Sequence, residues 1–81
     1  MNVNVRLSAG LAHSLGNPRL SVTLPDDATV ADLLAYLRRE HPQLQPRLET
    51  VIPMIAGRHA SPTQNLSAGQ EVALLLPAAG G

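Results

Sequence analysis

The sequence predicts an α+β fold: a mixed sheet of four or five strands, covered on one face by one main helix. Three observations support this prediction. Two segments of alternating polarity open the chain, one amphipathic helical segment follows them, and an apolar strand lies near the end. Covering one apolar sheet face with one helix is a stable way to build a small α+β domain.

The first two strands are predicted from alternation within residues 2–8 and 19–24. The apolar positions, which we expect to face inward, are Val3, Val5, Leu7, Leu20, Val22 and Leu24. Residues 9–18 lie between the two strands and contain two glycines, an asparagine and a proline. We interpret residues 9–18 as the long loop of a hairpin.

The helix is predicted to begin after Thr29, a good N-cap residue, with Asp32 near the positive end of the helix dipole. An apolar stripe recurs at helical spacing, at Val30, Leu33, Leu34 and Leu37. Tyr36 flanks this stripe and is expected to pack at its boundary. Pro42 predicts that the helix ends shortly before it.

Two further strands and a short return are predicted in the second half of the chain. Residues 51–56 have the composition of a strand, although Pro53 favours a sheet edge or irregular pairing. A turn at Gly57 leads into the short return, and the loop that follows contains Leu66 as an apolar plug. Residues 71–76 form the final strand.

The composition excludes several classes of function. Six acidic residues balance six basic ones, so we expect neither nucleic acid nor a membrane as a partner. There is no cysteine, and all six basic residues are arginine, so the chain has no thiol and no lysine amine. No secretory signal or apolar span is visible, and we expect a cytoplasmic protein.

The sequence ends in an unusual segment, with Gly80 and Gly81 at its tip. We expect residues 1–76 to form the domain and residues 77–81 to form a flexible tail. Glycine has no Cβ and can pass where a side chain would be blocked. The tail extends for at most about 17 Å. It is therefore suited to delivering its terminal carboxylate into the narrow active site of another protein.

Four segments of the sequence, taken in order, resemble the MoaD/ThiS family of sulfur carriers. They are Val3-Asn4-Val5-Arg6-Leu7, Ala28-Thr29-Val30-Ala31-Asp32-Leu33-Leu34, Leu66-Ser67-Ala68-Gly69-Gln70-Glu71-Val72-Ala73 and Pro77-Ala78-Ala79-Gly80-Gly81. The resemblance implies the β-grasp fold of ubiquitin-like proteins. It is greatest to the small subunit of molybdopterin synthase.

The resemblance also implies a chemical role for the tail, with no catalysis by this chain alone. A separate adenylating enzyme would convert Gly81 to an acyl-adenylate with ATP and Mg²⁺, and a persulfide donor protein would then convert it to a thiocarboxylate. The large subunit of molybdopterin synthase would take up the tail, and the sulfur would pass to the pterin precursor. Pro77 would stiffen the exit of the tail, and Ala78 and Ala79 would keep it narrow. We expect no bound cofactor and no metal.

An apolar docking face is expected beside the tail. If Val72, Leu74 and Leu76 point inward, Leu75 points to the face away from the helix. Either Met54 or Ile55 also points outward, depending on the parity of its strand. Such a contiguous exposed patch would mark a partner surface; the alternative is that loops or a second copy of the chain cover these residues. The arginines that could surround the tail's exit and contact an acidic partner are Arg6, Arg19 and Arg58.

Two alternatives stay open. The chain could be a carrier for thiamine, cysteine or thiolated-tRNA synthesis, or a protein modifier that uses the same activated tail. It could instead be a β-grasp interaction module whose glycines are incidental. The length of the chain and its long first loop favour the molybdopterin type. The three histidines, His13, His41 and His59, lie in separate segments without metal-ligand spacing and are expected in surface or capping roles.

Overall fold

The structure, a computed structural model, describes residues 1–77 and contains one five-stranded sheet. In chain order the elements are β1 (Asn2–Leu7), α1 (Ala9–Leu15), β2 (Arg19–Thr23), α2 (Val30–Glu40), the 3₁₀ helices η1 (Pro42–Leu44) and η2 (Arg47–Thr50), β3 (Ile52–Ile55), β4 (Arg58–His59) and β5 (Glu71–Leu75). The strand order is β2-β1-β5-β3-β4. The central pair β1 and β5 is parallel, and the other pairs are antiparallel.

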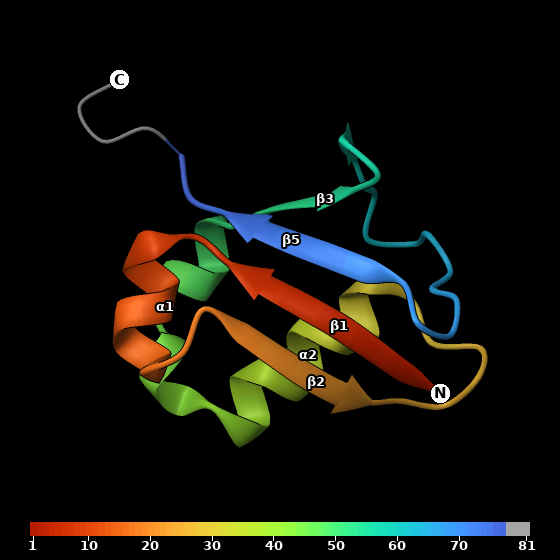
Figure 1. Ribbon diagram of the computed structural model, residues 1–81, viewed down its shortest axis with the longest axis horizontal. Helices are drawn as coiled ribbons and strands as arrows, with labels where there is room; N and C mark the ends of the chain where they lie inside the picture. Colours follow the sequence, from red (N-terminus) through yellow and green to blue (C-terminus); the bar gives the residue numbers. More distant parts are fainter. Residues whose placement is uncertain (78–81) are drawn as a thin grey trace.

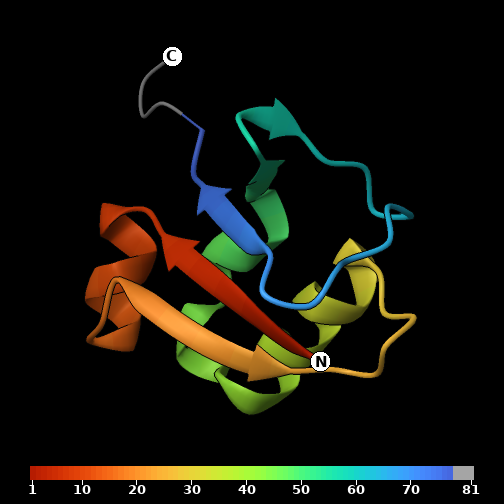
Figure 2. The ribbon, with the colours of Figure 1, turned by 45° about the vertical axis from the view of Figure 1, so that its right-hand side comes forward.

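Helix α2 crosses one face of this sheet, while α1 lies at the end of the sheet where β1 and β5 finish (Figure 1). The turned view in Figure 2 shows the same arrangement, with α2 behind β1 and β2. The predicted α+β fold with a mixed sheet is therefore confirmed. The prediction of a single main helix is incomplete, because α1 is a second one.

Residues 9–18 are not the loop that the sequence predicted. Residues Ala9–Leu15 form α1, and Leu11 on this helix is fully buried in the core. Gly16 ends the helix with a left-handed φ of 89°, and its N–H donates to the Ala12 carbonyl at 2.8 Å. This is the C-terminal role that glycine plays in helices. Burial of Leu11 outweighs the helix penalty of Gly10 within a segment that we interpreted as a turn.

Helix α2 matches its prediction from cap to end. The Thr29 hydroxyl accepts from the Asp32 N–H at 3.3 Å, and the Asp32 carboxylate accepts from the Thr29 N–H at 2.9 Å. This reciprocal pair is a capping box. Of the predicted stripe, Val30, Leu33 and Leu37 are fully buried and Leu34 is partly buried. Tyr36 packs at the boundary, as predicted.

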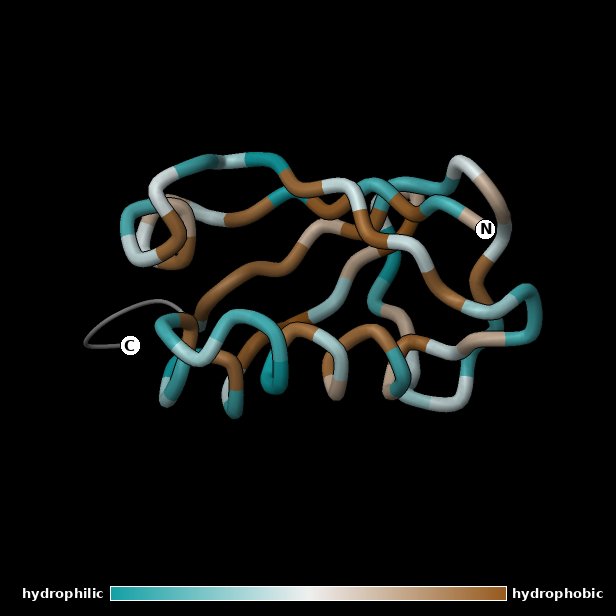
Figure 3. The backbone as a smooth tube through the Cα atoms, turned by 90° about the horizontal axis from the view of Figure 1, so that it is seen from below, coloured by the Kyte–Doolittle hydropathy of each residue, from teal (hydrophilic) through white to brown (hydrophobic). Residues whose placement is uncertain are grey.

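The core is aliphatic and lies between α2 and the sheet. Hydrophobic residues recur along both layers of the backbone in Figure 3. Leu44 and Leu48 add to this core from η1 and η2, in a segment for which the sequence predicted no regular structure. Leu66 is 4% exposed, so its role as a plug is confirmed. Within residues 1–77 no helix combines the length and apolarity needed to cross a membrane.

Strand β3 is not the edge strand that Pro53 favoured. It lies between β5 and the two-residue strand β4. The Pro53 carbonyl accepts from the Ala60 N–H at 2.9 Å, so the ring nitrogen of Pro53 faces that side as well. The missing N–H therefore removes no hydrogen bond from the ladder between β3 and β5. Proline is tolerated here because only the short β4 side loses a donor.

The turn between β3 and β4 offers a test of local strain. Ile55 pairs with Arg58, which leaves Ala56 and Gly57 as a two-residue turn with φ of 51° and 77°. A left-handed conformation costs an ordinary residue about 1–2 kcal/mol, and asparagine adopts it more easily. We therefore expect Ala56→Asn to stabilise the protein by about 1 kcal/mol. Urea unfolding measures this as a higher midpoint with an unchanged slope.

A matched control lies in the turn before β5. Ala68 is exposed and its φ is not positive, so Ala68→Asn should leave the urea midpoint unchanged. An equal rise in both variants would show that a general effect of asparagine, rather than relief of strain at Ala56, is responsible.

Candidate docking face and tail root

Side chains along β5 point alternately to the core and to the outer face, as predicted, although Ala73 on the outer face is itself only 6% exposed. Val72 and Leu74 are fully buried, Leu75 is 40% exposed, and Leu76 is partly buried against the core. Pro77 is exposed. We call residues 74–77 the tail root, because they comprise the end of the domain and Pro77, the first residue of the predicted tail.

Leu75 belongs to an apolar face on the side of the sheet opposite α2. In the antiparallel ladder of β3 and β5, Ile52 lies opposite Leu75 and Met54 lies opposite Ala73. Arg6 of β1 lies beside Ala73 on the other side. Paired residues share one face of a sheet. We call these five residues the docking face.

Parity settles which of the two β3 candidates points outward. Ile55 is 8% exposed and belongs to the core, whereas Met54 is partly exposed on the docking face. Met54 also lies opposite His59 of the edge strand β4. The structure therefore brings together two predicted site residues, Met54 and Leu75, on one face next to the tail root.

Two shallow grooves cross the docking face. The larger is lined by Arg6, Met54, Ile55, Ala56, Gly57, Gln70, Glu71, Ala73 and Leu75. The smaller is lined by Arg6, Leu7, Ser8 and Leu75. Arg6 and Leu75 line both grooves. An exposed leucine beside a cation and two hollows is a surface that a complementary protein can cover.

The charges around this face are mainly positive. The Glu71 carboxylate lies 3.4 Å from the Arg6 Nε and 3.9 Å from an Arg19 nitrogen. One carboxylate is thus shared by two guanidinium groups, which leaves a net positive charge. All three side chains are about half exposed or more, so each pair contributes little to stability. Arg58 lies on β4, paired with Ile55.

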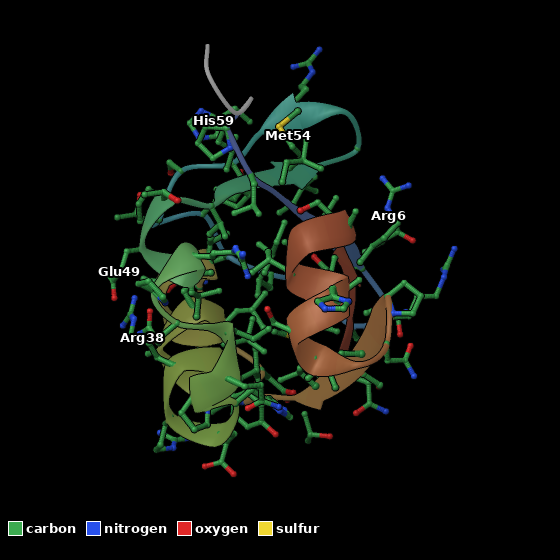
Figure 4. All side chains as sticks on the ribbon, turned by 90° about the vertical axis from the view of Figure 1, so that its left-hand side faces the viewer. Arg6, Arg38, Glu49, Met54 and His59 are labelled. Carbon is green, nitrogen blue, oxygen red and sulfur yellow. The ribbon has the colours of Figure 1, made fainter. Side chains whose placement is uncertain are left out.

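Figure 4 shows how the two sides of the molecule differ. Arg6 points to the side of the sheet away from α2, with Met54 near the top of the view. Arg38 and Glu49 point toward one another on the helical side, where Nε and Oε1 are 3.7 Å apart. The ion pair on the helical side therefore lies away from the docking face.

The other side of the tail root contacts α1, which the sequence did not indicate. Leu76 Cδ1 lies 2.9 Å from the position that a Cβ would have on Gly10. The Cδ and Nε of Arg47 lie 3.9 Å from the same position. These contacts join three segments that are distant in the chain. The sequence analysis could not find these contacts, because they depend on helix α1 (Ala9–Leu15), which it did not predict.

The remaining candidates show no catalytic or metal centre. His41 caps the C-terminus of α2, where its N–H donates to the Leu37 carbonyl at 2.9 Å. His13 and His59 are exposed on separate elements. Within residues 1–77, no three acidic or histidine side chains come together as a metal site. The predicted tail residues Ala78, Ala79, Gly80 and Gly81 lie outside the described residues.

The comparisons with known proteins identify the family. A model of the ThiS family matches residues 5–81. The chain belongs to the ThiS family. The comparison with curated proteins found no match.

Solved structures with the same fold cover all or nearly all of the ThiS-family chain. It is 30% identical to SAMP1 from Haloferax volcanii, with 100% of both chains covered and a TM-score of 0.89. A putative molybdopterin converting factor subunit 1 from Pyrococcus furiosus is 22% identical, with coverages of 96% and 99% and a TM-score of 0.86. A chain in the complex of subunits 1 and 2 of the molybdopterin-converting factor from Helicobacter pylori is 21% identical. The match covers 100% of both chains, with a TM-score of 0.73.

These likenesses confirm the predicted ubiquitin-like β-grasp fold, and the last two, below 25% identity, bear on the fold alone. A ubiquitin from Caldiarchaeum subterraneum also shares the fold, with 19% identity and a TM-score of 0.69. The ThiS-family chain is thus one of the small ubiquitin-like sulfur carriers and modifiers, which act together with partner enzymes.

Proposed function

We propose that this chain is a sulfur carrier, the small subunit of molybdopterin synthase, and that Gly81 is its reactive residue. The observation that supports this most is the position of the docking face, which adjoins the tail root of a sequence ending in Gly80-Gly81. A partner that covers Leu75 would lie next to the place from which the tail continues.

The chemistry begins at the terminal carboxylate, which is a poor electrophile. With a separate adenylating enzyme, one carboxylate oxygen attacks the α-phosphorus of ATP bound with Mg²⁺, and pyrophosphate leaves. The persulfide sulfur of a donor protein then attacks the acyl carbon, and AMP leaves. The product is an acyl disulfide. A thiol of the donor protein then attacks the donor's cysteine sulfur and cleaves the original persulfide S–S bond, which leaves the thiocarboxylate on Gly81 and a disulfide on the donor. The thiocarboxylate sulfur bonds to the pterin precursor, and water then hydrolyses the acyl C–S bond, which leaves the sulfur on the precursor and returns the carboxylate to Gly81.

The chain's own residues contribute recognition and access in this scheme. Leu75 and Met54 dock the partner, and Pro77 and the two alanines after it present a narrow tail. Glycines at the tip let the acyl carbon approach partner groups closely. The absence of lysine and cysteine means that no side-chain amine or thiol of this chain competes for the activated carbonyl.

The protein-modifier function is the second candidate, and a specific observation favours it. The chain is 30% identical to SAMP1 of Haloferax volcanii over the whole length, and a second structure from that organism, 28% identical, is of small archaeal modifier protein 1. A modifier uses the same activated tail but transfers the acyl group to a lysine. A carrier for thiamine, cysteine or tRNA thiolation would share every step up to the thiocarboxylate. One argument for the molybdopterin type is weakened, because the first connection is a helix rather than a long loop.

Purification of the tagged chain from its native host separates these functions. The proposal predicts co-purification with a pterin-binding large subunit, and in vitro conversion of the pterin precursor only when the tail carries sulfur. Isopeptide adducts on host lysines, without the large subunit, would support the modifier. Recovery of neither partner nor adducts would favour an interaction module and contradict the proposal.

If the large subunit binds to the docking face through Leu75, a charge at this position should weaken the complex. We expect Leu75→Asp to weaken binding to the large subunit by a factor of about 10–30, since a charge would replace an apolar contact at a central interface position. Isothermal titration calorimetry measures the affinity. Leu75 is 40% exposed, so thermal stability should change little.

Ala35→Asp is the matched control, because Ala35 is exposed on α2, on the other side of the sheet from the docking face. It should bind as the unaltered chain does. Equal weakening by both substitutions would attribute the effect to net charge and would contradict docking through Leu75.

A further inference from the structure

Leu76 lies over a residue whose lack of a side chain makes the contact possible. A Cβ on Gly10 would lie 2.9 Å from Leu76 Cδ1, closer than carbon atoms pack. Gly10 is in the first turn of α1, and its φ is not in the left-handed region. Its backbone conformation therefore does not require glycine. Glycine fits at this position because a larger residue would take the space that the Leu76 side chain occupies.

Arg47 lies near the same Cβ position on Gly10. Its Cδ and Nε lie 3.9 Å from the Cβ position on Gly10, and its guanidinium donates to the Ser14 hydroxyl at 3.0 Å. Ser14 in turn donates to the Gly10 carbonyl at 3.2 Å. The apolar stem of Arg47 therefore lies over the first turn of α1. Within residues 1–77 Arg47 has no carboxylate partner within salt-bridge distance.

We propose that Gly10 and Arg47 are positioning residues that form a seat for Leu76, and that this seat fixes the point from which the reactive tail continues. The proposal rests on the proposed function for its catalytic consequence. Leu75 docks the partner on one side of the strand, while Leu76 is held on the other. The tail then starts from a fixed point relative to the docked surface. Ordering of the tail root in advance lowers the entropic cost of inserting the tail.

The central test is Gly10→Ala, because it separates positioning from folding. The added methyl displaces the flexible tip of Leu76, while alanine favours the helix over glycine. Thermal stability should therefore be unchanged or slightly higher. Loss of one ordered residue at the tail root should raise KM for this chain about five- to thirty-fold in the reaction of the host's adenylating enzyme, with kcat within about twofold. ATP–pyrophosphate exchange measures both constants.

Arg47 provides a matched pair of variants. Arg47→Met keeps the apolar stem and removes the charge, whereas Arg47→Ala removes both. The seat predicts a raised KM for Arg47→Ala and a nearly unchanged KM for Arg47→Met. An equal loss in both variants would assign Arg47 to a charged contact with the enzyme and would overturn its role in the seat.

A spectroscopic measurement on the full chain tests the seat independently of activity. ¹⁵N relaxation should give Leu76 an order parameter of about 0.85 in the unaltered chain and a value below about 0.6 in Gly10→Ala and Arg47→Ala. An order parameter that is low in all three proteins, or unchanged among them, overturns the seat. If the unaltered chain supports no pyrophosphate exchange while the order parameters behave as stated, the proposed function fails and the seat stands.

Discussion

Removal of Gly81 should abolish thiocarboxylate formation while leaving the fold intact. The deletion retracts the terminal carboxylate by about 3.5 Å. A misplacement of about 1 Å at a reacting centre can already cost a factor of 100 in rate. We therefore expect loss of at least two orders of magnitude in adenylation, measured as ATP–pyrophosphate exchange with the host's adenylating enzyme.

The same variant should unfold at the same temperature as the unaltered chain. Among the described residues the buried core ends at Leu74, with Leu76 packed at its edge. The length-preserving variant Ala79→Gly is the control and should keep its activity. A fall of many degrees in Tm on deletion of Gly81 would mean that the end of the chain is structural, and full activity of the shortened chain would contradict the proposed role of Gly81.

Replacement of Leu74 should have the largest effect on stability. Its side chain is fully buried at the centre of the sheet, where β5 lies between β1 and β3. Leu74→Ala leaves a cavity and should lower the free energy of unfolding by about 2–5 kcal/mol. A domain of this size has a total of about 4–12 kcal/mol, so the variant approaches the limit of folding. Urea unfolding measures the loss.

The neighbouring residue is the matched control. Leu75→Ala removes the same atoms from a side chain that is 40% exposed, and it should cost less than about 1 kcal/mol. Comparable decreases in the free energy of unfolding of the two variants would show that both leucines are buried in solution. That result would contradict the assignment of Leu75 to an exposed docking face.

Patterns within single segments were sufficient to predict most of the fold. Alternation identified the inward faces of β1 and β2, and a cap residue with an apolar stripe identified α2. Parity along β5 placed Leu75 outside, because Val72 and Leu74 are both fully buried. These predictions succeed because side-chain direction follows directly from the period of the backbone.

The failures came from contacts between distant segments. Helix α1 contains two residues with poor helix propensity, Gly10 and Ser14, and it forms because tertiary packing buries Leu11. Pro53 is accommodated inside the sheet because the neighbouring strand β4 is only two residues long. The choice between Met54 and Ile55 likewise needed the pairing of β3 with β5.

Only part of the candidate site at the tail root could be predicted from the sequence. Its outer side, with Leu75, could be predicted from alternation alone. Its inner side depends on the meeting of Leu76, Gly10 and Arg47 across three segments, and no sequence period reports such a meeting. The resemblance to the family pointed to the tail, but the approach of Leu76 to Gly10 became visible only with the fold.

The central claim is that the final carbonyl of the chain carries sulfur. Intact-mass spectrometry of the protein isolated from its native host, with fragmentation to locate any change, tests it most directly. We predict a species heavier by the exchange of one oxygen for one sulfur, with the change confined to Gly81. An unaltered Gly81 in cells that actively thiolate their cofactors, or sulfur found at any other residue, would contradict the claim.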